Sequence, residues 1–176
     1  MRKIFIIIAL AIGMLCNTGV TFSAERDAVE YKLKAAYMLN FAKFINWPDV
    51  HDGEETFRIC VYGKNPFGSA LAGAERKKIK GEVIELVLTS DPAELKDCRL
   101  AFVSSSEVDR IDTLFETLSG KPIVTVSDIE GFATAGGTIE FVSVGDKLRF
   151  VINHTQAKSS NVKITASLLG LAVEVL

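Results

Sequence analysis

Apolar side chains recur every three or four positions between residues 29 and 44, and this spacing predicts a long helix with one apolar face. The positions with this spacing are Val29, Leu33, Ala36, Tyr37, Asn40 and Phe44, of which Asn40 is polar. Asp27 with Glu30 three residues later forms a capping box, which predicts the start of the helix. Trp47 precedes Pro48 and is therefore disfavoured in a helix, so we expect the helix to end near Asn46.

Four short runs rich in β-branched and aromatic residues follow this helix and predict strands. They span residues 57–62, 83–88, 100–103 and 122–126. The segments between them predict turns and helices. These are a turn at 63–68 followed by a short helix through Leu71, a helical turn from Asp91, and a helix at 106–118. Strands that alternate with helices are typical of a mostly parallel sheet.

The last third of the chain has a different pattern. Apolar residues alternate with polar ones or valines over 139–144 and again over 148–152, and Gly145-Asp146 separates the two runs. This pattern predicts an antiparallel hairpin in which Phe141 faces Phe150 and Ile139 faces Ile152. From Val162 onward the apolar spacing predicts a closing helix.

Together these elements predict an α/β three-layer sandwich. Its sheet is mixed and mostly parallel and ends in the antiparallel hairpin.

The N-terminus predicts export. Arg2-Lys3, an apolar run over residues 4–15 and a small polar stretch to Ala24 have the layout of a secretory signal peptide. The run is shorter than the roughly 20 residues that a membrane span needs. We therefore expect residues 1–24 to be a cleaved signal peptide, and residues 25–176 to form a single domain in the periplasm.

Composition narrows the class of partner. The chain of 176 residues is 48% hydrophobic and 24% charged, as in ordinary globular proteins. Removing residues 1–24 leaves 152 residues with a net charge of −4. A basic nucleic-acid binder is therefore disfavoured.

Two cysteines remain after the signal peptide, Cys60 and Cys98. In an oxidising compartment such a pair tends to form a disulfide, although two separate buried thiols are the alternative. The two histidines, His51 and His154, lack the short ligand spacing of a structural zinc site, so we expect no metal. The sequence also contains no nucleophile motif such as Gly-x-Ser-x-Gly, so we expect neither an enzyme nor a cofactor.

Two candidate sites follow from the predicted topology. Ligands of α/β sheets usually bind beyond the carboxyl ends of the strands, which predicts a small-molecule crevice there, with a turn-forming role for Asp128 as the alternative. The crevice residues are Lys64, Asn65, Ser104, Ser105 and Asp128.

The second candidate is a docking strip on the hairpin face opposite Phe141 and Phe150. Valines on this face alternate with charged residues, and the side chain of an arginine there suits a protein interface. The strip contains Val142, Arg149 and Val151, with Val144 beside them and Glu140 and Lys147 as flanking charges. A helix that covers this face is the alternative.

Four segments, in order along the mature chain, resemble the YfiR family. They cover residues 32–48, 61–68, 125–141 and 148–153. The family consists of periplasmic proteins that repress a YfiN-type inner-membrane diguanylate cyclase and that a YfiB-like outer-membrane lipoprotein can sequester. Cys60 and Cys98 match the long-range cysteine pair of the family, whereas the closer second pair of some members is absent.

The resemblance implies a regulator that lowers cyclic di-GMP and biofilm formation by binding the periplasmic part of the cyclase. The expected partners are that cyclase, the lipoprotein and a second copy of this chain. A small-molecule sensing domain for a nucleotide or amino acid is the alternative function.

Overall fold

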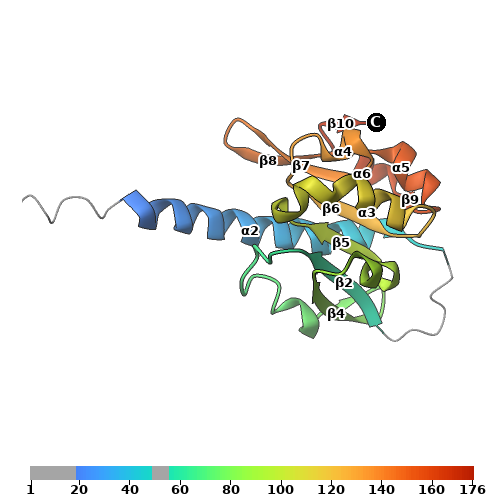
Figure 1. Cartoon of the computed structure of the whole chain (residues 1–176), viewed down its shortest axis with the longest axis horizontal. Coiled ribbons are helices and arrows are strands. Elements are labelled where there is room, and N and C mark those ends of the chain that lie inside the picture. Colours follow the sequence, from blue (N-terminus) through green and yellow to red (C-terminus); the bar gives the residue numbers. More distant parts are fainter. Residues whose placement is uncertain (1–18, 49–55) are drawn as a thin grey trace, which may run out of the picture.

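The computed structural model describes residues 19–48 and 56–176, with side chains from residue 25. It contains one long helix, several short helices and ten strands among these residues (Figure 1). The α-helices are α2 Gly19–Phe44, α3 Ile111–Leu118, α4 Phe132–Ala135, α5 His154–Ser159 and α6 Ala166–Leu169. The 3-10 helices are η2 Ala74–Arg76, η3 Pro92–Asp97 and η4 Ser105–Arg110.

Eight strands form one mixed sheet in the order β10-β8-β7-β6-β5-β2-β4-β3. Their bounds are β2 Thr56–Tyr62, β3 Lys78–Ile79, β4 Glu82–Thr89, β5 Leu100–Val103, β6 Val124–Ser127, β7 Ile139–Val144, β8 Lys147–Ile152 and β10 Glu174–Val175. Strands β4, β2, β5, β6 and β7 are parallel, and β7 and β8 form an antiparallel hairpin. Two further strands, β1 Ile45–Asn46 and β9 Lys163–Ile164, pair beside the sheet. The predicted α/β class with a mostly parallel sheet is confirmed.

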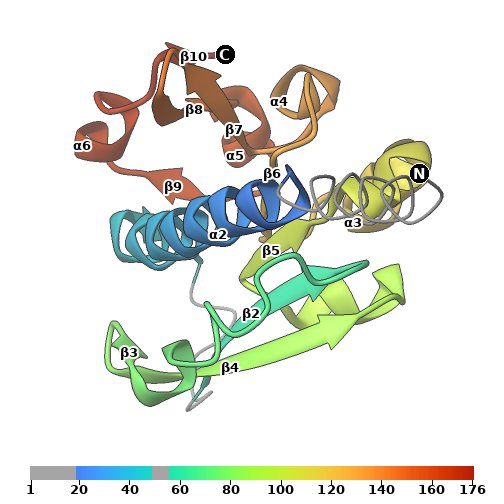
Figure 2. The same cartoon turned by 90° about the vertical axis from the view of Figure 1, so that its left-hand side faces the viewer.

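Helices cover both faces of the sheet, which makes three layers (Figure 2). On one face α2 packs against the sheet mainly through Ala35, Met38, Phe41 and Ala42, and not through most of the predicted apolar positions, of which Val29, Leu33 and Phe44 are 61%, 46% and 40% exposed. Phe41 lies against Phe141 and Phe150, with ring centroids 5.8 and 4.9 Å away. On the other face Leu114 of α3 and Phe132 of α4 pack in a second cluster that includes both cysteines. Burial of these two apolar clusters is the main force that holds the layers together.

The predicted hairpin register is confirmed. Phe141 pairs with Phe150 and Ile139 with Ile152, and Gly145 in the connecting turn has a φ of +59°. A two-residue loop fixes this register, and glycine adopts the left-handed backbone at little cost.

Several details of the prediction differ from the structure. The first helix begins at Gly19 and not at the capping box of Asp27. No helix forms directly after the turn at residues 63–68, where turns lead to η2. The short helices α4 and α5 were not predicted. The predicted apolar run at residues 4–15 lies outside the described residues, so the signal peptide and its cleavage stay a prediction.

The predicted closing helix is wrong because strand pairing competes with it. Ile164 pairs with Ile45 in β1–β9, and Val175 pairs with Ile152 of β8. Only the four residues of α6 stay helical between these strands. Among the described helices, none is both long enough and apolar enough to cross a bilayer.

The structure joins Cys60 of β2 to Cys98, which follows η3, in a disulfide across 38 positions of sequence. Both residues are buried against the α3 face. The bond therefore links the centre of the sheet to its covering layer.

Candidate functional site

The carboxyl ends of the parallel strands open onto a hollow of about 740 Å³. The middle turns of α2 and the β7–β8 hairpin form its other walls. Its lining residues are Asp27, Glu30, Tyr31, Lys34, Ser105, Asp128, Glu130, Glu140, Phe141, Val142, Ser143 and Leu148.

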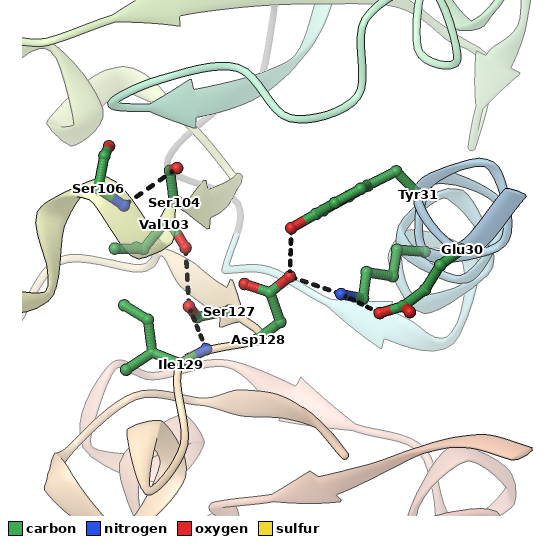
Figure 3. A network of polar contacts seen from close by, with 9 residues as sticks. Glu30, Tyr31, Val103, Ser104, Ser106, Ser127, Asp128 and Ile129 are labelled. Carbon is green, nitrogen blue, oxygen red and sulfur yellow. Dashed lines mark hydrogen bonds and ion pairs between the residues drawn. The ribbon is translucent and has the colours of Figure 1, made fainter. Parts of the chain in front are cut away.

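A buried lysine links α2 to this edge of the sheet. Lys34 is only 3% exposed, and its Nζ lies 2.5 Å from Oδ2 of Asp128 and 2.6 Å from Oε1 of Glu30 (Figure 3). A buried ammonium is tolerated where carboxylates pair with it. The ion pair with Asp128 therefore attaches α2 to the sheet at the carboxyl end of β6.

Tyr31 completes this network. Its hydroxyl donates to the same oxygen of Asp128 at 2.8 Å, and the Lys34 Nζ lies 4.4 Å from the centre of the Tyr31 ring. Burial, together with the hydrogen bond to Asp128, raises the pKa of Tyr31, so the phenol stays protonated and stays a donor at neutral pH. The other carboxylate oxygen of Asp128, Oδ1, is buried and has no hydrogen-bond partner.

Serines hold the neighbouring strand ends in place (Figure 3). The Ser127 hydroxyl donates to the carbonyl of Val103 at 2.7 Å and accepts from the amide of Ile129 at 3.1 Å. Ser104 is buried and caps η4 by accepting from the amide of Ser106 at 3.4 Å. These bonds tie β5 to β6 and set the direction of the loop that carries Asp128.

Of the predicted crevice residues, Ser105 and Asp128 line the hollow. Ser104 is not among the lining residues; it is buried and caps η4. Lys64 and Asn65 are not among the lining residues: Lys64 is exposed, and Asn65 accepts from the amide of Phe67 at 2.9 Å within a turn. Binding of a ligand by these residues stays a prediction.

Glu30, Tyr31 and Lys34 belong to the site, and sequence reasoning did not assign them to it. The predicted apolar face of the helix did not include position 34, so the pattern of the sequence provided no reason to expect a buried lysine there. Its partner on another element was not visible without the fold.

The position of Glu140 differs from the prediction for the docking strip. It was expected to flank the strip as a surface charge, but it is buried. Its carboxylate accepts from the amides of Gly131 at 2.9 Å and Ala133 at 3.0 Å at the start of α4. The free amides of a helix start bind a carboxylate well, so Glu140 fixes the β6–β7 connection and is not free to meet a partner.

The remaining strip residues share one face of the hairpin, because Val142 pairs with Arg149 and Val151 with Glu140. Val142, Arg149 and Val151 are half-buried, and Val144 is 54% exposed. Val144 and Arg149 border a hollow of about 590 Å³ together with Val173. We call Val142, Val144, Arg149, Val151 and Val173 the valine strip.

The charge of the 740 Å³ hollow is strongly negative. Five carboxylates line it, and Lys34 is the sole cationic side chain among the lining residues that the structure describes. Such a surface attracts cations and ammonium groups. In the described part of the chain, no three His, Cys, Asp or Glu side chains lie together in a way that could hold a metal ion. His51, which was not expected to bind a metal, lies outside that part.

Comparison with solved structures shows proteins of similar fold. The ABC domain from Streptococcus pneumoniae in complex with L-Trp has a TM-score of 0.55 and 13% identity, over 81% of this chain and 60% of that one. A conserved domain protein from Vibrio cholerae O1 biovar eltor has a TM-score of 0.56 and 9% identity, over 83% of this chain and 60% of that one. The chain thus spans about 60% of the length of each, and at these identities the likeness concerns the fold alone.

No curated protein matches the sequence. A family match, in contrast, covers residues 31–173, which include α2 from Tyr31 onward, strands β1 to β9 and the whole valine strip, but not Asp27 and Glu30 of the 740 Å³ hollow. The order of segments that suggested the resemblance is therefore supported over nearly the whole described chain, and the protein belongs to the YfiR/HmsC-like family.

Proposed function

We propose that this protein is an exported regulator that binds the periplasmic part of a YfiN-type inner-membrane diguanylate cyclase and holds that enzyme inactive. The family match over residues 31–173 is the observation that carries this proposal. The disulfide between Cys60 and Cys98 supports a periplasmic location, because such bonds persist in oxidising compartments.

Repression of this kind needs no catalytic residue in the regulator. A ligand shifts a two-state enzyme only by binding one state more tightly than the other. A preference of about 100-fold for the inactive state lowers the active fraction by a similar factor when the inactive state is saturated. The regulator must therefore present one well-defined docking surface.

We assign this role to the valine strip. Val144 and Val173, 54% and 43% exposed, give it accessible apolar area, and the Arg149 guanidinium reaches the carbonyl of Leu171 at 3.4 Å. An apolar patch beside an arginine has the composition of interface hot spots. Membership of the family suggests two further partners for exposed surfaces: a YfiB-like lipoprotein and a second copy of this chain.

Deleting the gene in a host that expresses the cyclase should raise cellular cyclic di-GMP and surface attachment. The gene for the native protein should restore repression, whereas a version without residues 1–24 should not. A version with Val144→Asp or Arg149→Glu should also fail, because a charge or a reversed charge in the strip weakens docking, by roughly ten-fold or more for a hot-spot residue. Cyclic di-GMP is measured by mass spectrometry.

Val108→Asp is the matched control, since Val108 is a similarly exposed valine of η4 outside the strip. It should repress like the native protein. Thermal unfolding of each purified variant separates lost docking from lost folding. Unchanged cyclic di-GMP on deletion would contradict the repressor function, and full repression by Val144→Asp and Arg149→Glu would contradict the assigned surface.

The acidic hollow supports a second candidate function, the sensing of a small molecule. Its volume of about 740 Å³ suits a small ligand, and the Oδ1 of Asp128 is buried without a partner. Because carboxylates dominate the lining, an amino acid with a cationic group fits this site better than a nucleotide with phosphates. Such binding and repression of a cyclase are compatible.

Calorimetric titration should therefore detect binding of arginine or lysine and none of nucleoside monophosphates. Glu130→Gln, an exposed change in the lining, should weaken that binding several-fold through the lost charge. Glu94→Gln, on the exposed side of η3, is the control and should bind as the native protein does. No heat with arginine or lysine would contradict the sensing of a cationic amino acid.

A further inference from the structure

Charge is distributed unevenly between the two ends of the parallel strands. The acidic hollow lies at their carboxyl ends. At their amino ends a second hollow, of about 540 Å³, lies between the C-terminal turns of α2 and the strands β3 and β4. Figure 2 shows β3 on the same side of the molecule as the C-terminal turns of α2.

Three lysines surround this second hollow, and no carboxylate lines it. Lys43, Lys77 and Lys78 are exposed, whereas Ile79 and Ile84 at its base are buried. We call this feature the lysine hollow. Its charge could not be inferred from composition, since the mature chain carries a net charge of −4.

The charges of these lysines are uncompensated within the described chain. Lys77 and Lys78 have no ion pair or hydrogen bond through their side chains with any described residue, and Lys43 only donates to Oδ1 of Asn40 at 3.2 Å. The ion pairs of the described chain lie elsewhere, for example Lys34 with Asp128 and Arg99 with Glu82 at 2.8 Å. The positive potential of the lysine hollow is therefore available to an external anion.

Neighbouring residues extend the positive surface. Arg76 and Lys80 flank the two lysines in sequence, so four of the five residues from 76 to 80 are basic. The Lys80 Nζ is held at 2.5 Å from both the carbonyl of Ile45 and Oδ1 of Asn46. These two bonds tie the turn after β3 to β1, which directly follows α2, and keep the basic residues on one side of the molecule.

We propose that the lysine hollow binds the phosphate head groups of an anionic phospholipid bilayer and orients the protein on the membrane surface. Clusters of four or more basic residues bind such surfaces, with roughly a five-fold gain in partitioning for each lysine. Lysine ammonium groups on flexible stems suit mobile phosphates, and among the described residues no partner holds Lys77 and Lys78 in the fixed geometry that recognition of one acidic protein surface requires. The apolar base accepts the carbon atoms next to a head group.

Binding to the membrane surface goes beyond the proposed repression of the cyclase. It rests on the proposed function only in one respect: a membrane-bound cyclase places the protein near a bilayer. The acidic end is repelled by the same anionic surface, so both ends favour one orientation. The valine strip and the acidic hollow then point away from the lipid and stay accessible. Since no described helix crosses a bilayer, the contact is peripheral and sensitive to salt.

Co-sedimentation with vesicles tests the proposal on the exported protein. Vesicles of phosphatidylglycerol mixed with phosphatidylcholine should bind the protein at low salt, whereas phosphatidylcholine alone should not. Lys77→Gln/Lys78→Gln should lower the partition coefficient about 30-fold, from two lost charges. Both lysines are exposed, and circular dichroism should show an unchanged fold.

Lys64→Gln/Lys147→Gln is the matched control, because both lysines are exposed, lie at the opposite end and change the net charge equally. It should bind like the native protein. An equal loss in both double variants would show attraction by net charge only and would overturn the proposal. So would binding of soluble glycerol phosphate without binding of vesicles. No cyclase is present in this assay, so its failure is distinct from failure of the repressor function.

Discussion

Lys34→Met will lower the free energy of unfolding by about 3–5 kcal/mol, as expected when one partner of a buried ion pair is removed. The Lys34 ammonium is surrounded by Asp128, Glu30 and the Tyr31 ring. Without it, the Asp128 side chain, which is 12% exposed, keeps a charge whose buried Oδ1 already has no partner. Urea unfolding followed by circular dichroism measures the loss.

The double variant Lys34→Met/Asp128→Asn separates the two contributions. It removes both charges, so its free energy of unfolding should lie well above that of Lys34→Met alone. Lys32→Met, on the exposed side of the same helix, is the control and should change stability by less than about 0.5 kcal/mol. A loss below about 1 kcal/mol for Lys34→Met would show that water enters the hollow and solvates the carboxylate.

Cys60→Ala/Cys98→Ala will lower the free energy of unfolding by about 4 kcal/mol. The bond closes a loop over 38 positions, and the chain-entropy model assigns that magnitude to a loop of this length. The native protein, denatured without reductant, should show no free thiol in a titration. Reduction of the native protein should reproduce the stability of the double variant.

Two thiols in the denatured, unreduced protein would contradict the bond and restore the alternative of two separate buried cysteines. A stability loss equal to that of a simple change in core packing, about 1 kcal/mol, would show instead that the loop is already ordered in the unfolded chain.

The hairpin shows how local pattern can specify structure. Alternation has a period of two residues, and one slip in register would turn Phe141 and Phe150 outward. Together with the two-residue turn at Gly145, the alternation allowed only one pairing register for the two strands, and the structure has this register. The strand cores at 57–62, 83–88 and 100–103 were also predictable from their composition, within one residue at most ends.

The C-terminal segment shows where local pattern is insufficient. The spacing of Ile164, Leu168 and Val175 fits a helix, yet Ile164 and Val175 lie in strands. An apolar residue can be buried by a helix face or by a strand pair, and the partner decides between them. Here the partners are Ile45 and Ile152, which are distant in sequence.

The sequence by itself determined the fold class, the hairpin register and the family, because periodicity and ordered motifs are local properties of the chain. Tertiary structure alone decided which charges meet. Asp128 is 94 positions from Lys34, and Lys43 approaches Lys77 and Lys78 only because α2 lies against β3. Electrostatic pairing depends on distance in space, and a buried charge must find its partner wherever the fold places it. The acidic hollow and the lysine hollow are therefore properties of the fold and not of any segment of the sequence.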